Sequence, residues 1–234
     1  MFSRAISGML VFDVDDSMGL PSLQRRGVSV VALLALVVLA APPPVDAQSS
    51  LRSSFPGRRI GGGTRGECSA RFLAHLVPAT SVFSPGAGQL IGLLEGPSAS
   101  PYPLQLTFAP YRTDSPPLTS GPGVTQRLLP ASAAGLVLIS APAVKAPTSW
   151  ESSYRCPNGA GGGSELDFVQ TASPPAISLL LPQSEPADQP IQQQLQRLQK
   201  ACGKSLPLAE IAQVFGLTDA LAQGWPEQLP VRCP

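Results

Sequence analysis

Proline recurs through nearly the whole of this chain and limits the structures that it can form. The 234 residues include 27 prolines and 22 glycines. Proline lacks a backbone N–H and has a fixed φ, so it interrupts long helices and is excluded from the middle of central strands. A chain of this kind is expected to form short strands joined by turns. We therefore predict a mainly β domain.

Alternation of apolar and polar side chains supports this prediction. Segment 102–110 places four bulky side chains on one face of a strand, namely Tyr102, Leu104, Leu106 and Phe108. The apolar segment 135–141 is typical of a strand buried on both faces. Further candidate strands are 69–77, 89–94, 124–129, 150–156, 165–170 and 176–181. About eight short strands predict an immunoglobulin-like, antiparallel β-sandwich over 68–181.

After the last predicted strand, the composition and the periodicity change. Residues 182–189 are polar and contain proline, and we interpret them as a linker. Beyond the linker, apolar side chains recur at helical spacing, at Ile191, Leu195, Leu198 and Cys202. A second helix is predicted over 206–215. We expect 190–234 to be a helical hairpin, a small α-helical appendage to the sandwich.

Residues 1–47 have the features of a signal peptide. Arg25 and Arg26 precede an apolar run of 14 residues, 28–41, which is shorter than the roughly 20 residues of a membrane-spanning helix. Small residues ahead of position 48 predict cleavage between Ala47 and Gln48. Because a leader that begins at Met18 would have an ordinary length, we expect translation to start there.

This leader predicts where the mature protein works. The paired arginines leave the twin-arginine route open, although the residues behind them fit the general secretory route better. We expect the mature protein in the periplasm or outside the cell, with no transmembrane span after cleavage.

The four cysteines all follow the predicted cleavage site, at Cys68, Cys156, Cys202 and Cys233. In an oxidising compartment such residues usually form disulfides. Three pairings are possible, and we favour Cys68 with Cys156 and Cys202 with Cys233, because each pair then lies within one predicted segment. Zinc ligands come in pairs about two to four residues apart. These cysteines are 88, 46 and 31 residues apart, so no metal site is predicted.

The charge balance argues against a nucleic-acid partner. From position 48 onwards, 13 Lys or Arg residues stand against 11 Asp or Glu residues, a net charge of about +2. Segment 208–223 has the spacing of a helix-turn-helix, but 209–229 contains no Lys or Arg to contact phosphates. We predict neither nucleic-acid binding nor a cofactor.

The lead-in to the domain, 48–67, is rich in glycine and arginine and is expected to be flexible. Five arginines lie within twenty residues, at Arg52, Arg58, Arg59, Arg65 and Arg71. Guanidinium groups bind phosphate, sulfated or uronate sugars and acidic lipid headgroups. We take Arg58, Arg59 and Arg65 as candidate ligand-binding residues, and a solvated arm is the alternative.

Residues for catalysis are few, and no catalytic residue is predicted. The single histidine, His75, lies in an alternating segment and is interpreted as structural. An enzyme would need a concave pocket that brings His75 together with a carboxylate and a serine.

Several short motifs occur in an order that resembles the exported cyanobacterial family catalogued as domain of unknown function 928. The motifs are GRRIGGGTRGEC at 57–68, LVP at 76–78, PLQLTFAPY at 103–111, GLVLISA at 135–141 and YRC at 154–156. The resemblance spans 56–181, and 208–221 is similar to the helical tail of many members. It implies export and a β architecture, and it supplies no activity and no catalytic residues.

Two functions remain from the sequence. The favoured one is a non-enzymatic cell-envelope β-sandwich that binds a polymer or a partner protein, or has a structural role. The alternative is an envelope hydrolase whose site is assembled from residues scattered along the chain.

Overall fold

The computed structural model describes residues 47–62, 71–113, 120–156 and 174–234. The chain divides into two compact units, 1–43 and 44–234, and every described residue belongs to the second. The predicted start at Met18 and the predicted leader, apart from Ala47, lie outside the described residues. Export therefore stays a prediction.

The described part of the chain contains eleven strands, three α-helices and three short 3-10 helices. The strands are β1 (Ile60–Gly61), β2 (Leu73–His75), β3 (Val82–Phe83), β4 (Leu90–Glu95), β5 (Leu104–Pro110), β6 (Thr125–Leu129), β7 (Gly135–Ser140), β8 (Thr148–Tyr154), β9 (Ala176–Leu180), β10 (Ser205–Pro207) and β11 (Gln228–Arg232). The helices are α1 (Ala47–Ser54), α3 (Gln189–Lys200) and α4 (Leu208–Val214), and the 3-10 helices are η1 (Gly86–Gly88), η2 (Pro186–Asp188) and η3 (Thr218–Ala220).

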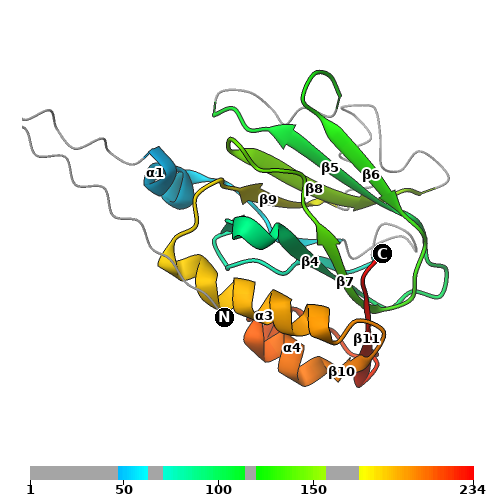
Figure 1. The fold of residues 1–234 in the computed structure, drawn as a ribbon. Coiled ribbons are helices and arrows are strands. Elements are labelled where there is room, and N and C mark those ends of the chain that lie inside the picture. Colours follow the sequence, from blue (N-terminus) through cyan, green and yellow to red (C-terminus); the bar gives the residue numbers. More distant parts are fainter. Residues whose placement is uncertain (1–46, 63–70, 114–119, 157–173) are drawn as a thin grey trace, which may run out of the picture. The chain divides into compact units, whose positions relative to one another are not determined.

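The strands form two sheets (Figure 1). One has six strands in the order β1-β2-β4-β7-β11-β10, and the other has five in the order β3-β9-β8-β5-β6. Neighbouring strands are antiparallel except for two parallel pairs, β7 with β11 and β3 with β9. The prediction of a β-sandwich with a small helical part is confirmed. Seven of the eight predicted strands are present, and the eighth, 165–170, lies outside the described residues.

How much of each strand is buried depends on whether one or both faces of its sheet are covered. In β5 the predicted inward residues Leu104, Leu106 and Phe108 are buried, and the residues between them are half-buried. Strands β4 and β7 are buried along nearly their whole length, because α3 packs against both of them. This arrangement explains the continuous apolar run at 135–141.

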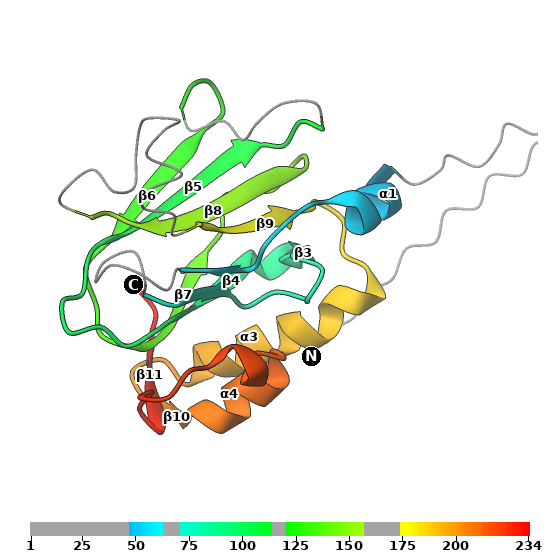
Figure 2. The same cartoon turned by 180° about the vertical axis from the view of Figure 1, so that it is seen from behind.

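Gly92 allows α3 to lie close to β4. A Cβ atom at this position would lie only 2.8 Å from the Cδ2 of Leu195 on the helix. Leu195 and Leu198, both on the predicted apolar stripe, are buried against the sheet. Figure 2 shows α3 and α4 on the same side of the six-stranded sheet.

The C-terminal segment 190–234 contains the predicted helices and, in addition, two strands that the sequence analysis did not identify. Strand β11 lies beside β7 and pairs with β10 on its other side, so the segment forms part of the six-stranded sheet. Leu229 and Val231 of β11 are buried, but the strand is short and contains Pro230, which obscures its alternation.

Two further segments differ from the sequence predictions. The expected linker, 182–189, contains η2, and Asp188 at its end is fully buried. The described part of the expected flexible lead-in, 48–62, contains most of α1, strand β1 and a bridge from Arg58 to Ile177. Both segments are held by side-chain contacts to distant parts of the chain, which local composition does not reveal.

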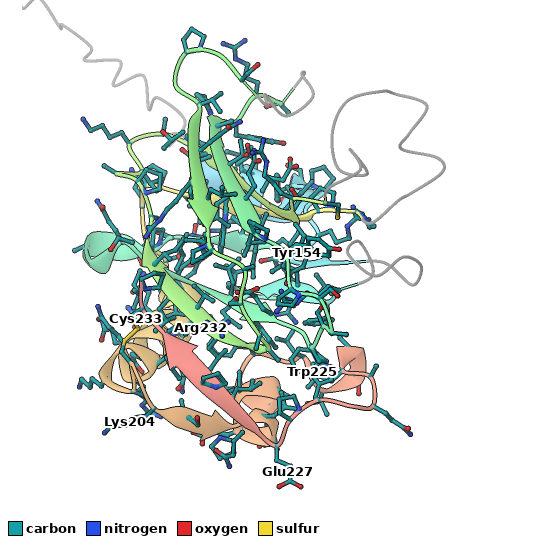
Figure 3. The ribbon with its side chains drawn as sticks, turned by 90° about the vertical axis from the view of Figure 1, so that its right-hand side faces the viewer. Tyr154, Lys204, Trp225, Glu227, Arg232 and Cys233 are labelled. Carbon is teal, nitrogen blue, oxygen red and sulfur yellow. A yellow bond between two sulfur atoms is a disulfide. The ribbon has the colours of Figure 1, made fainter. Side chains whose placement is uncertain are left out.

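A disulfide joins Cys202, just after α3, to Cys233, just after β11, with the Cα atoms 5.9 Å apart. This is the predicted pair, and Figure 3 shows Cys233 at the end of β11. Two backbone hydrogen bonds support the same junction, from Gly203 N to Val231 O and from Val231 N to Lys204 O, both 2.8 Å long. Cys68 lies outside the described residues, so its pairing with Cys156 stays a prediction.

No helix in the described ranges has both the length and the apolar character needed to cross a bilayer. The same ranges hold no group of three or more His, Cys, Asp or Glu side chains that could bind a metal ion.

The disulfide should contribute to stability because it closes a 31-residue loop. Replacing both Cys202 and Cys233 by Ser should lower the free energy of unfolding by up to about 3.7 kcal/mol, since the unfolded chain regains the entropy of that loop. Urea unfolding followed by tryptophan fluorescence measures the change. Ser205→Ala, an exposed substitution in the same segment, is the control, and an unchanged unfolding midpoint in the double variant would contradict this role.

Candidate functional site

His75 lies between the two sheets and is completely buried. Its Nδ1 is 2.8 Å from Ser178 Oγ and its Nε2 is 2.8 Å from Ser152 Oγ. The imidazole ring stacks on Trp150, with ring centroids 3.5 Å apart and an interplanar angle of 4°. Strand β2 supplies the histidine from the six-stranded sheet, and β8 and β9 supply its partners from the other sheet. His75 therefore ties the two sheets together.

This environment keeps the imidazole neutral. Burial lowers the pKa of His75 well below its ordinary value of 6.5, because the charged form would lose its hydration. A neutral ring has one donor and one acceptor nitrogen, and a serine hydroxyl can pair with either. No described carboxylate hydrogen-bonds His75, and neither ring nitrogen reaches the surface. Of the two partners that the hydrolase alternative requires, serines lie beside His75, whereas no carboxylate among the described residues hydrogen-bonds it.

Arg59, a predicted ligand-binding residue, is used inside the fold. Its guanidinium donates hydrogen bonds to the carbonyl oxygens of Val77, Phe215 and Gly216, at 2.9, 2.7 and 2.8 Å. Two of these carbonyls lie at the C-terminal end of α4, where a cation is favoured. Burial lowers the pKa of Arg59. The side chain thus joins the segment before β2 to the second helix of the C-terminal segment.

Arg52 has a similar internal role. Its guanidinium binds both carboxylate oxygens of buried Asp188, at 3.1 and 2.7 Å, and also pairs with Glu185 at 2.9 Å. The same carboxylate accepts hydrogen bonds from the backbone N–H groups of Ser84 and Glu185. This network fastens α1 to the start of α3.

A third arginine, Arg71, takes part in a buried ionic cluster around Glu95, the last residue of β4. The Glu95 carboxylate lies 3.3 Å from Arg71 and 3.3 Å from Arg232, and it accepts a 2.8 Å hydrogen bond from Ser132. Burial raises the pKa of Glu95, and the nearby arginines act in the opposite direction. The cluster joins β4 to β11 and to the loop before β7.

Tyr154 completes this cluster. Its hydroxyl lies 3.5 Å from Glu95, and the Arg71 guanidinium lies 4.7 Å from the centre of its ring. Burial and the Glu95 charge raise the pKa of Tyr154 well above its ordinary value. Figure 3 labels Tyr154 and Arg232, which come from β8 and β11. All of these groups are paired with one another, so the cluster is a structural tie between the sheets.

The five arginines therefore do not form one surface patch. Arg52, Arg59 and Arg71 are bound to three separate parts of the interior. Arg58 has an exposed side chain, and Arg65 lies outside the described residues. Of the two predicted ligand-binding residues that the structure describes, Arg58 is exposed to a ligand and Arg59 is bound within the fold.

A groove on the surface is another candidate site. It has a volume of about 500 Å³ and lies between α3 and the turn that leads into β4. One wall is formed by Pro85, Ala87, Gly88 and Leu90, and the other by Gln192, Leu195, Gln196, Gln199 and Lys200.

The walls of the groove are fixed by local structure. The Gln192 amide donates two 2.7 Å hydrogen bonds, to the carbonyl of Ser84 and to the hydroxyl of Ser184, and so holds α3 to the opposite wall. Gln89 adopts a left-handed conformation with φ of 45° at the end of η1, which turns the chain into β4. An added Cβ at Gly88 would meet no atom within 4 Å, so the space beside it is open.

The groove is not visible in the sequence because its walls are about a hundred residues apart in the chain. A partial signal for one wall exists, since Gln192, Gln196 and Gln199 follow helical spacing on a face of α3 that borders the apolar stripe. One of the buried carboxylates has a clearer signal. Glu95 directly follows the predicted strand 89–94 in step with Ile91 and Leu93, and a charge on that inward face requires a partner.

The role of Arg59 can be separated from ligand binding by comparison with its neighbour. Arg59→Met should lower the free energy of unfolding by about 1.5–3 kcal/mol, because carbonyl groups lose charged hydrogen-bond donors. Arg58→Met, at an exposed side chain, should change it by less than about 0.5 kcal/mol. Urea unfolding of both variants tests this, and equal effects would contradict the structural role of Arg59.

The buried neutral imidazole predicts a pH dependence. The unfolded chain takes up a proton on His75 below pH 6.5 while the folded protein does not, so stability falls as the pH falls, by up to about 1.4 kcal/mol per pH unit. His75→Gln keeps a donor and an acceptor but does not titrate. The stability difference between wild type and this variant should therefore shrink from pH 6.5 to pH 5 in urea unfolding. A difference that is independent of pH would refute the prediction.

Comparison with known proteins adds no assignment. No family model, no curated protein and no solved structure matches this chain. The resemblance to the cyanobacterial family stays a prediction.

Proposed function

We propose that this chain is an exported protein of the cell envelope that binds a polymer or a partner protein through the groove beside α3, without a catalytic step. The observation that carries the proposal is the contrast between the groove and the polar clusters. The groove is open and lined by exposed amides and an ammonium group. The histidine and Glu95, the groups best suited to proton transfer, are enclosed and paired.

Further features support an exported binding protein. The disulfide between Cys202 and Cys233 suits an oxidising compartment such as the periplasm or the extracellular space. The groove combines a partly apolar surface with a few polar groups, as ligand sites commonly do. Its walls are held by α3, the hydrogen bonds of Gln192 and the packing of Leu195, so the site is formed before a ligand arrives.

The proposal predicts that filling the groove abolishes binding. Gly88→Trp places a large side chain into the open space, while Gln193→Trp adds the same side chain to an exposed position of α3 outside the groove. Each variant and the wild type are immobilised and exposed to solubilised envelope material, and the retained protein and sugar are quantified by mass spectrometry and monosaccharide analysis. The wild type and Gln193→Trp should retain material that Gly88→Trp loses.

Two outcomes would contradict this proposal. Equal retention by Gly88→Trp and wild type would show that the groove is not the site. Loss of retention in Arg58→Ala with full retention in Gly88→Trp would place binding at the lead-in instead. Far-UV circular dichroism of every variant ensures that the comparison is made between folded proteins.

A further inference from the structure

The lining of the groove combines apolar and polar groups. Ala87 and the half-buried Leu90 supply apolar surface, and the exposed amides of Gln196 and Gln199 lie along one side. Lys200, at the last turn of α3, is the only ionisable side chain that lines it. The lining contains no carboxylate.

This lining matches a chain of sugar rings. A pyranose ring has an apolar face of C–H groups and an edge of hydroxyls, and each glutamine amide offers two donors and one acceptor to such hydroxyls. The apolar wall can pack against the ring face while the amides pair with the edge. Neither contact requires a charge on the sugar.

An extended peptide fits the groove less well. Peptides that bind beside a strand take their affinity from the free backbone groups of a sheet edge. Strand β4 is paired with β7 along its whole length, and its pairs with β2 on the other side begin at Leu93. Ahead of those pairs, Leu76 donates a hydrogen bond to the Gly92 carbonyl and Ile91 is fully buried, so the edge left at Leu90 is too short for a peptide strand. The polar amides interrupt the apolar surface that an amphipathic helix would need.

One end of the groove favours a negative charge. Lys200 is exposed at the C-terminal end of α3, and Arg197 and Lys204 are exposed close to it in the chain. The acidic residues at the other end of the helix, Glu185 and Asp188, are both paired with Arg52. An anionic ligand is therefore attracted to the Lys200 end without a competing carboxylate in the lining.

We propose that the groove binds an acidic polysaccharide, with sugar hydroxyls on Gln196 and Gln199 and an anionic substituent of the sugar on Lys200. This inference rests on the proposed function and adds the chemical class of the ligand. The anionic group can be a carboxylate, as in a uronate, or a sulfate or phosphate ester, because an ammonium group binds each of them.

Matched ligands separate the contribution of the charge from that of the sugar. Isothermal titration calorimetry of the purified protein compares oligogalacturonate with its methyl ester, which has the same sugar rings without the charge. Dextran sulfate and dextran form the second pair, and oligomers of phosphorylated sugar with their dephosphorylated counterparts form the third. In the pair whose anionic group is the one that the groove recognises, the acidic oligomer should bind more tightly than the neutral one. Its affinity should fall as salt is added.

Matched variants test the residues. Lys200→Gln should weaken binding of the acidic oligomer about tenfold, the size expected for one charged hydrogen bond, and leave the neutral oligomer unchanged. Arg197→Gln removes a charge from the same turn outside the groove and is the control. Gln196→Ala with Gln199→Ala should weaken both oligomers of the pair.

The inference is overturned if none of the acidic sugars binds, if the acidic and neutral oligomers bind equally, or if Lys200→Gln and Arg197→Gln have the same effect. Its failure can be told from failure of the proposed function. If Gly88→Trp still loses envelope material while all sugars fail to bind, or if the retained material is protein, the groove is a binding site for another class of ligand and the polysaccharide assignment is wrong.

Discussion

The contact of His75 with Trp150 and two serines is the interaction on which the sandwich most depends. Here the six-stranded sheet meets the five-stranded sheet through hydrogen bonds as well as through packing, at the centre of the core. A ring with two nitrogens can be placed in a dry interior only if both are satisfied. The two serines meet that condition and so fix how one sheet is positioned over the other. The Trp150 indole N–H has no hydrogen-bond partner among the described residues, so its orientation depends on stacking alone.

Arginine side chains form a second set of contacts, which connect distant segments of the chain around this centre. The backbone of Arg59 accepts a hydrogen bond from the N–H of His75, and its guanidinium reaches the end of α4. Arg52 fastens α1 to η2, and Arg71 joins the cluster at Glu95. Arginine suits this work because its five donors can satisfy several carbonyl or carboxylate oxygens at once. Arg52, Arg59 and Arg71 therefore act as internal connectors near the start of the domain.

Much of the fold could be predicted from local patterns. Strands with one buried face show alternation, as in β5, and a strand covered on both faces shows a continuous apolar run, as in β7. The helix α3 was visible from the spacing of Leu195 and Leu198. Each of these signals reflects an environment that is uniform along a single element.

Other features depend on residues that are distant in the chain. The density of arginine at 52–71 does not reveal that Asp188 or Phe215 will meet these side chains. Strand β11 was missed because Pro230 interrupts a short pattern and its partner β7 lies about ninety residues earlier. The groove was hidden for the same reason, since neither wall is concave by itself. Sequence periodicity describes faces, whereas sites of this kind are formed where two faces meet.

The position of β11 in the sheet also governs when the fold can be completed. Strand β7 gains its second neighbour only from residues 228–232, and β10 has no partner among the described strands other than β11. Until those residues have emerged, one side of β7 keeps unpaired backbone groups and the Glu95 carboxylate lacks Arg232. The six-stranded sheet therefore reaches its full hydrogen bonding only after segment 205–232 has folded against it.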